Sequence, residues 1–132
     1  MDAETRREVR QRGGNRCEYC RLPQAHTGLT HHIEHIRAKR HGGTDDPENL
    51  ALACHRCNNR KGPNIAGIDP MNDTVSELFH PRRDGWADHF VFQGARIEGA
   101  TAVGRATVQL LGMNDARRVE LRSQIMAREE LG

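Results

Sequence analysis

The chain has 132 residues, with 20 Lys and Arg against 18 Asp and Glu, and 36% of its residues are hydrophobic. This length predicts one domain with a modest apolar core, and the formal charge of +2 argues against a generic nucleic-acid coat protein. No stretch reaches the roughly 18–20 apolar residues that span a bilayer, and the N-terminus lacks a hydrophobic signal region. We therefore expect an intracellular, cytoplasmic protein without membrane association.

The first half of the chain predicts a short helix, two strands and a second helix. Residues 2–12 form a charged helix that stops at Gly13-Gly14, and its thin apolar content predicts weak packing. A strand is expected over residues 29–36, followed by a loop through Pro47. Residues 49–52 suit either a helix start or a short strand, and we favour the strand, with the helix beginning near Cys57.

The second half predicts a loop, a hairpin and two helices. Residues 62–74 are rich in Gly, Pro, Asn and Asp, which predicts a loop wrapped around the first half. Residues 90–93 and 96–98, split by Gly94-Ala95, predict a β-hairpin. The aromatic residues between and beside these segments are expected to form the main apolar cluster: Phe79, Trp86, Phe90 and Phe92.

Two helices are expected at the end of the chain. Thr101 caps the first, which ends at Gly112, and Asn114 or Asp115 caps the second, which runs through Leu131. The last helix has an apolar set of Val119, Leu121, Ile125 and Met126, with arginines around it. We interpret it as a packed surface helix rather than a helix that binds a partner.

Four cysteines, all that the chain contains, form two Cys-x-x-Cys pairs, Cys17/Cys20 and Cys54/Cys57, separated by 33 residues. Two such turns brought together provide the tetrahedral sulfur set that Zn²⁺ prefers. The alternatives are two disulfides or free buried thiols. Because a four-cysteine site has no open coordination position, the predicted zinc is structural and not catalytic.

Six of the eight histidines lie in or beside the segment between the pairs. Within it, His32-Ile33-Glu34-His35 alternates as a strand does, so that His32 and Glu34 share one face. A carboxylate beside an imidazole suits metal-assisted hydrolysis, in which the carboxylate holds a divalent cation and the imidazole takes a proton from water.

The stretch from Cys17 to Gly62, which includes HHIEHIRAKRHGGTDDPENLALACHRCNNRKG, resembles HNH endonucleases of the four-cysteine, zinc-stabilised kind. The family's acidic residue and His on the first strand, its loop Asn, and its polar ligand just after the last Cys occur in order. The resemblance implies a ββα-metal finger and covers about a third of the chain.

The resemblance also implies roles. His35 corresponds to the general base, and Glu34 and Asn58 to the ligands of a catalytic Mg²⁺ or Mn²⁺. Asn49 corresponds to the Asn that braces the loop and helps to orient the base. The family more often has Asp at the position of Glu34, which leaves the metal open and allows His32 to share the ligand role.

Cationic residues flank the proposed site, namely Lys39, Arg40, Arg60 and Lys61. They are candidates for nucleic-acid binding through phosphate contacts, and the alternative is an ordinary solvated face. Residues 1–63 hold 12 Lys and Arg against 8 Asp and Glu, whereas residues 64–132 hold 8 against 10. This asymmetry favours the first half as the phosphate-facing half.

The predicted fold is α+β, a small zinc-held ββα-metal (HNH) finger with its N-terminal helix over residues 1–63. An extension over residues 64–132 is expected to pack on the finger within one compact domain. The predicted function is metal-dependent endonucleolytic cleavage of DNA by a protein that is a monomer or a dimer. The alternatives are a zinc-stabilised nucleic-acid-binding module without cleavage activity and a protein-interaction module.

Overall fold

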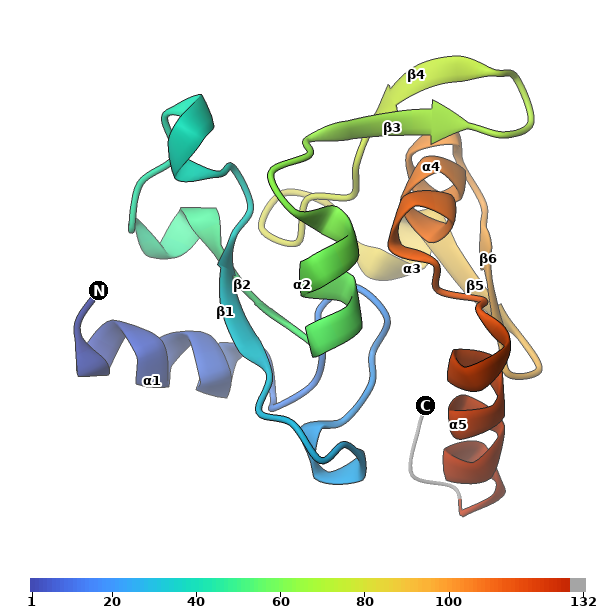
Figure 1. Cartoon of the computed structure of the whole chain (residues 1–132), viewed down its shortest axis with the longest axis horizontal. Helices are drawn as coiled ribbons and strands as arrows, with labels where there is room; N and C mark the ends of the chain where they lie inside the picture. Colours follow the sequence, from blue (N-terminus) through green and yellow to red (C-terminus); the bar gives the residue numbers. More distant parts are fainter. Residues whose placement is uncertain (129–132) are drawn as a thin grey trace.

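The computed structural model describes residues 1–128, which form five α-helices and three two-stranded antiparallel sheets (Figure 1). The first half contains α1 (Ala3–Arg12), β1 (His32–His35), β2 (Leu50–Ala53) and α2 (His55–Lys61), with 3₁₀ turns at Gln24–His26, Lys39–His41 and Pro47–Asn49. The second half contains β3 (Ala66–Asp69), β4 (Thr74–Glu77), α3 (Trp86–His89), β5 (Phe90–Gln93), β6 (Arg96–Gly99), α4 (Ala102–Leu111) and α5 (Ala116–Ala127). The α+β class is therefore confirmed. No helix within residues 1–128 is both long enough and apolar enough to cross a membrane.

The finger consists of β1, β2 and α2. The strands pair antiparallel, with His32 opposite Ala53 and His35 opposite Leu50. All four residues of β2 are buried because the strand lies inside the first half. The predicted choice of a strand at residues 49–52 is confirmed, and α2 begins at His55, two residues before the expected start.

Helix α1 packs on the finger more firmly than its composition predicts. Val9 is fully buried and packs with Leu50 and Leu52. Arg12 donates from Nη2 to the carbonyl oxygen of Leu50 at 2.8 Å, and Arg10 donates to that of His31 at 3.1 Å. The expectation of weak packing is wrong because guanidinium hydrogen bonds to main-chain oxygens supplement one apolar contact.

The segment predicted as a loop over residues 62–74 instead contains β3, which pairs with β4. Its turn is stabilised by Asp69, whose carboxylate accepts from the main-chain N–H of Met71 and from the side chain of Asn72. Asp69 also binds Arg105 of α4 through two hydrogen bonds of 2.9 Å, which lower the pKa of Asp69 to about 2. The turn residues of this segment led to the prediction of a loop. The structure instead has a hairpin of two short strands, and Asp69 and Arg105 link this hairpin to α4.

The aromatic cluster joins the two halves, as predicted. Phe79 and Trp86 each lie 5.1 Å from Phe90, measured between ring centroids, and Trp86 lies 5.2 Å from Phe92. The indole N–H of Trp86 donates to the carbonyl oxygen of Tyr19 at 2.7 Å, next to the first cysteine pair. The core therefore includes the cysteines and the aromatic residues in one cluster.

The C-terminal elements follow the predicted order. The hairpin β5–β6 and helix α4 are confirmed, with the Thr101 hydroxyl accepting from the N–H of Gly104 at 3.0 Å and Gly112 in the left-handed region. Helix α5 differs in its orientation, because Arg118 and Arg122 are buried whereas Val119 is only partly so. The expected continuation to Leu131 lies partly outside the described residues.

Candidate metal centre and active site

The four cysteine side chains meet in the core between β2, α2 and the turn of Cys17 and Cys20, which we call the first knuckle. Their sulfurs all lie within 4.8 Å of one another, the cysteines are buried, and none forms a disulfide. A tetrahedral zinc with Zn–S bonds of about 2.3 Å holds its sulfurs about 3.8 Å apart. The sulfurs of Cys20 and Cys54 lie 3.7 Å apart, so the cluster has the dimensions of a four-thiolate zinc site.

The electrostatics of the thiols also fit a cation. Burial raises the pKa of the Cys17 and Cys57 thiols well above the usual value. Hydrogen bonds within the cluster, first of all with Cys17, lower the pKa of Cys20. Four buried thiolates therefore require positive charge beside them, which a zinc ion supplies.

Arg118 of α5 provides part of that charge. Its Nη2 lies 2.9 Å from the sulfur of Cys57 and its Nη1 donates to the carbonyl oxygen of Leu111. Burial opposes the charge on Arg118, but the cluster sulfurs, with Cys57 first, outweigh this and raise its pKa above the usual value. The last helix thus contacts the metal centre through a buried arginine that the sequence interpretation had placed on the surface.

Glu34 lies on β1 with its side chain turned inward toward α2. It is 5% exposed and accepts a hydrogen bond from the hydroxyl of Tyr19. The ammonium group of Lys61 lies 3.4 Å from Oε2 of Glu34 and donates to the carbonyl oxygen of Ile36 at 2.8 Å. Burial raises the pKa of Glu34 above its usual value, and Lys61 and Tyr19 act against that rise.

His35 is the neighbour of Glu34 and faces the loop between β1 and β2. Its Nε2 lies 2.7 Å from Oδ1 of Asp45, and its side chain is 24% exposed. The hydrogen bond with His35 is the main cause of a lowered pKa of Asp45, which keeps that carboxyl ionised. Because Asp45 accepts the Nε2 proton, the lone pair of this imidazole lies on Nδ1.

Asn49 holds the loop that carries Asp45. Its Oδ1 accepts from the N–H of Arg37 at 2.9 Å, and its Nδ2 donates to the carbonyl oxygens of Arg37 and Thr44 at 3.0 and 2.8 Å. These three hydrogen bonds link the segment after β1 to the segment before β2. They keep both ends of the loop together beside His35.

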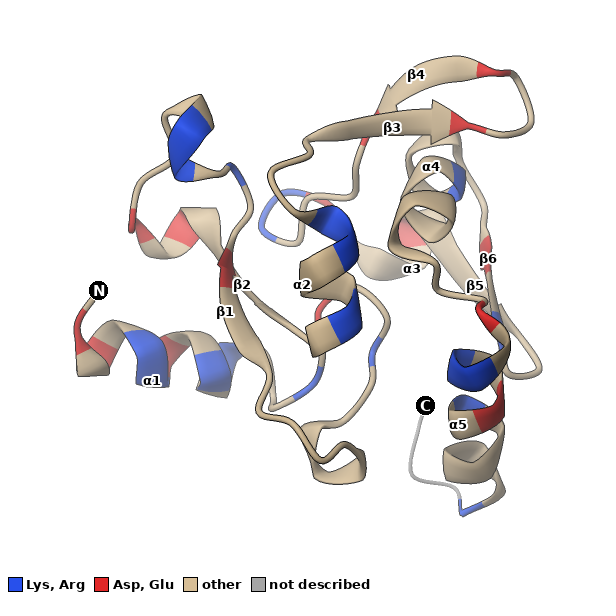
Figure 2. Cartoon of the chain, in the orientation of Figure 1, with Lys and Arg blue, Asp and Glu red and all other residues tan. Residues whose placement is uncertain are grey.

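Asn58 and the two β1 residues line the same open pocket, of about 670 Å³. The Asn58 side chain makes no hydrogen bond to any residue between 1 and 128, so its amide oxygen is available. Lys39 and Arg40 also line this pocket, which we call the finger pocket. Figure 2 shows the basic segment at residues 39–40 and the basic residues of α2 on the two sides of β1.

The remaining predicted residues lie elsewhere. The Nε2 of His32 lies 3.3 Å from Nδ1 of His55, and His32 does not line the finger pocket. Arg60 is half-exposed and directed to the other side of α2, where it donates to the carbonyl oxygen of Leu110. Lys61 is 1% exposed, so it is not a surface cation and its partner is Glu34.

Three residues that matter here were missed by the sequence interpretation, namely Tyr19, Asp45 and Arg118. Tyr19 lies between the cysteines of the first pair, a position that gives no signal of its contact with Glu34. Asp45 lies in an acidic turn that was recognised only as a turn. Asp45 lies ten residues after His35 in the sequence. The two side chains meet because Asn49 holds the ends of the intervening loop together, a contact that the sequence does not indicate.

The first half of the molecule is a zinc-finger-like ββα unit. It consists of an antiparallel strand pair followed by a helix, and four thiols bring its two chain segments together. Residues 17–64 match the family model described as HNH endonuclease, so the finger is similar to the domain of that family. No curated protein and no solved structure matches the chain. The domain match connects the chain with nucleases and covers the finger but not the C-terminal elements.

Proposed function

We propose that the protein is a metal-dependent endonuclease that hydrolyses phosphodiester bonds in DNA. The observation that carries this proposal is that Glu34, His35 and Asn58 line one pocket within the segment that matches the HNH family. An acid, an imidazole and an amide oxygen at one open pocket are the groups that metal-assisted attack of water on a phosphate requires.

His35 is the general base. Asp45 accepts its Nε2 proton at 2.7 Å and so leaves Nδ1 to accept a proton from water. Asp45 also stabilises the imidazolium that forms after this transfer. Asn49 is a positioning residue in this scheme, because it contacts the loop that carries Asp45 and does not line the finger pocket.

Glu34 and Asn58 would hold a catalytic Mg²⁺ or Mn²⁺, and their environment fits that role. A carboxylate has about four lone-pair sites, of which Tyr19 and Lys61 use two, and the Asn58 oxygen is free among the described residues. A bound divalent ion supplies charge stabilisation at the scissile phosphate and the leaving oxygen. Lys39 and Arg40 at the rim of the finger pocket would bind neighbouring phosphates.

The test is cleavage of supercoiled plasmid with added Mg²⁺ or Mn²⁺ by the wild type, by His35→Ala and by His41→Ala. His41 is an exposed histidine outside the pocket lining and is therefore the matched control. Zinc content is measured for each protein. We expect nicking by the wild type and the control, and loss of nicking in His35→Ala while one zinc per chain is retained.

A non-cleaving nucleic-acid-binding module is the second candidate, and one observation favours it. Both oxygens of Glu34 have a partner, and one of these partners is a buried ammonium group that competes with a metal ion for the carboxylate. If the wild type binds DNA but cuts no substrate with either ion, this second function replaces the first.

A further inference from the structure

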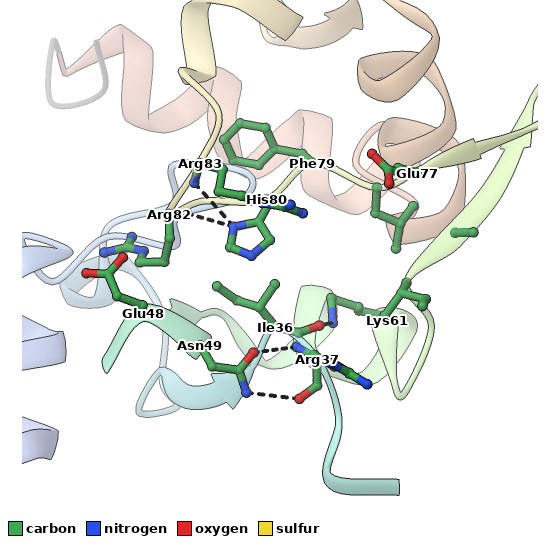
Figure 3. A pocket seen from close by; sticks show the side chains of 13 residues that line it. Ile36, Arg37, Glu48, Asn49, Lys61, Glu77, Phe79, His80, Arg82 and Arg83 are labelled. Carbon is green, nitrogen blue, oxygen red and sulfur yellow. Dashed lines mark hydrogen bonds between the residues drawn. The ribbon is translucent and has the colours of Figure 1, made fainter. Parts of the chain in front are cut away.

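A second cavity lies beside the finger pocket, between the end of β1 and the segment that follows β4. It has a volume of about 520 Å³, within the range of small-ligand sites. The ring of His80 stands among its lining residues, directed toward Ile36 and Asn49 (Figure 3). We call this cavity the His80 pocket.

The walls of the His80 pocket are largely apolar. Ile36, Leu78 and Phe79 are 6%, 7% and 3% exposed, and all three line it. Buried apolar and aromatic walls of this kind hold flat organic rings and are poor sites for a free phosphate, which needs hydrogen-bond donors on several sides.

A few polar groups are fixed within these walls. The Nδ1 of His80 accepts from the main-chain N–H groups of Arg82 and Arg83, at 3.2 and 3.3 Å. The proton of the neutral ring therefore lies on Nε2, which makes no hydrogen bond to any described residue. Burial, and then the charge of Arg83, lower the pKa of His80, which favours the neutral ring. Nε2 is thus an oriented donor, and Glu48 and Glu77 add acceptors to the lining.

The unused hydrogen-bonding capacity extends to Arg82. Its Nη2 pairs with Glu18, but its Nε is buried without a partner. Arg37 and Arg83 add positive charge around the apolar walls. Apolar walls, mixed donors and acceptors, and nearby guanidinium groups together match a nucleobase whose flanking phosphates remain outside.

The two pockets are neighbours along one strand end. His35 lines the finger pocket and Arg37 lines the His80 pocket, and two extended residues span at most about 7 Å. Successive nucleotides of a duplex strand are about 3.4 Å apart along the axis. This separation is compatible with one strand that places a phosphate in the finger pocket and a base one or two nucleotides away in the His80 pocket.

We propose that the His80 pocket binds a nucleobase turned out of the stack next to the scissile phosphate, so that the preferred substrate is DNA with an unpaired nucleotide. This inference rests on the proposed function for its substrate class and goes beyond it in naming the DNA structure. The neutral ring of His80 and the carboxylates recognise the edge of the base, and the apolar walls replace its stacking partners.

The test measures binding and not cleavage. His35→Ala is used as the parent in Ca²⁺, with two 20-mer duplexes that contain 2-aminopurine either as a single bulged nucleotide or fully paired. A base held against apolar walls is worth several-fold to more than a hundredfold in affinity, so we expect about tenfold tighter binding of the bulged probe. The bound bulged base is also expected to be protected from quenching by acrylamide.

Ala66→Phe fills the pocket, because Ala66 lines it from β3, and Val75→Phe is the matched control on an exposed position of β4. We expect Ala66→Phe to lose the preference for the bulged probe and Val75→Phe to retain it. If Ala66→Phe does not fold, acrylamide protection in the parent decides the question.

Equal affinity of the parent for both probes, or unprotected 2-aminopurine in the bound state, overturns the pocket proposal. Plasmid nicking by the wild type is independent of both results. A preference that survives in Ala66→Phe likewise overturns it, since a flexible bulge then binds elsewhere on the surface.

Discussion

The buried pair of Lys61 and Glu34 is expected to stabilise the fold in a way that depends on pH. The two side chains are 2% and 4% exposed, with 3.4 Å between Nζ and Oε2. We consider Lys61→Met, which keeps the length of the side chain and removes its charge. The variant leaves a carboxylate in the interior without its ammonium partner, and breaking a buried pair in this way costs about 3–5 kcal/mol.

Protonation of Glu34 limits this cost. The ordinary pKa of the group is 4.5. Neutralising it at pH 7 costs at most about 3.4 kcal/mol, because each pH unit above that value corresponds to about 1.36 kcal/mol. At pH 5.5 the limit is about 1.4 kcal/mol by the same relation. We therefore expect a loss of about 3 kcal/mol at pH 7, or about 11 °C in Tm for a chain of this length.

The direction of the pH dependence follows from the raised pKa of Glu34. A group that binds its proton more tightly in the folded state adds stability that is complete below pH 4.5 and is lost as the pH rises through the folded-state pKa. Removing Lys61 raises the pKa of Glu34 in the folded state further. The free energy of unfolding then falls over a wider pH range above 4.5. The penalty of the variant is thus larger at pH 7 than at pH 5.5.

The assay is urea unfolding at both pH values with zinc present, for Lys61→Met, for the double variant with Glu34→Gln, and for Lys39→Met. Lys39 is the control because its side chain is 67% exposed, and we expect a change below about 0.5 kcal/mol. The double variant should regain most of the stability, since a neutral amide needs no counter-charge. A penalty that is unchanged between the two pH values, or a double variant as unstable as the single, would show that the charge of Glu34 is not what Lys61 stabilises.

Three further outcomes are expected. Arg118→Ala should weaken zinc binding by about 10–100-fold in competition with a chelator, because a hydrogen bond to a ligand sulfur is lost, and an unchanged affinity would contradict this role. Gly104→Ala should destabilise the fold by about 1–3 kcal/mol in thermal unfolding, because a Cβ would lie 2.0 Å from a main-chain oxygen of α3, whereas Gly67→Ala meets only ordinary contacts and should be neutral. Asp45→Asn should lower kcat by part of the about 10²–10⁴-fold that a positioned base contributes, with KM unchanged, and a raised KM alone would argue against orientation of His35.

The finger was predictable because its signals are local. Two Cys-x-x-Cys turns, an alternating strand and a short helix after the last pair each have a recognisable spacing, and the sulfur cluster has the geometry they imply. The capped helix at Thr101 and the hairpin at Gly94 were predictable for the same reason. In each case a few adjacent residues determine the backbone.

The missed features depend on contacts between distant residues. The hairpin of β3 and β4 is stabilised by the ion pair of Asp69 and Arg105, which are 36 residues apart in the sequence. Since the local sequence shows only turn residues and not this contact, it predicted a loop. Lys61 and Arg118 were assigned to the surface because charged residues are seldom buried. Their partners, Glu34 and the sulfur of Cys57, become visible only once the fold brings them together.

Trp86 is the single tryptophan of the chain, and its position makes it an intrinsic optical reporter. Its indole N–H is held by the carbonyl oxygen of Tyr19, the residue that precedes Cys20, and its ring lies against Phe90 and Phe92. Any loosening of the first knuckle alters the surroundings of this indole directly. The emission spectrum of the unlabelled protein will therefore follow loading and removal of the metal in real time, separately from any nuclease assay.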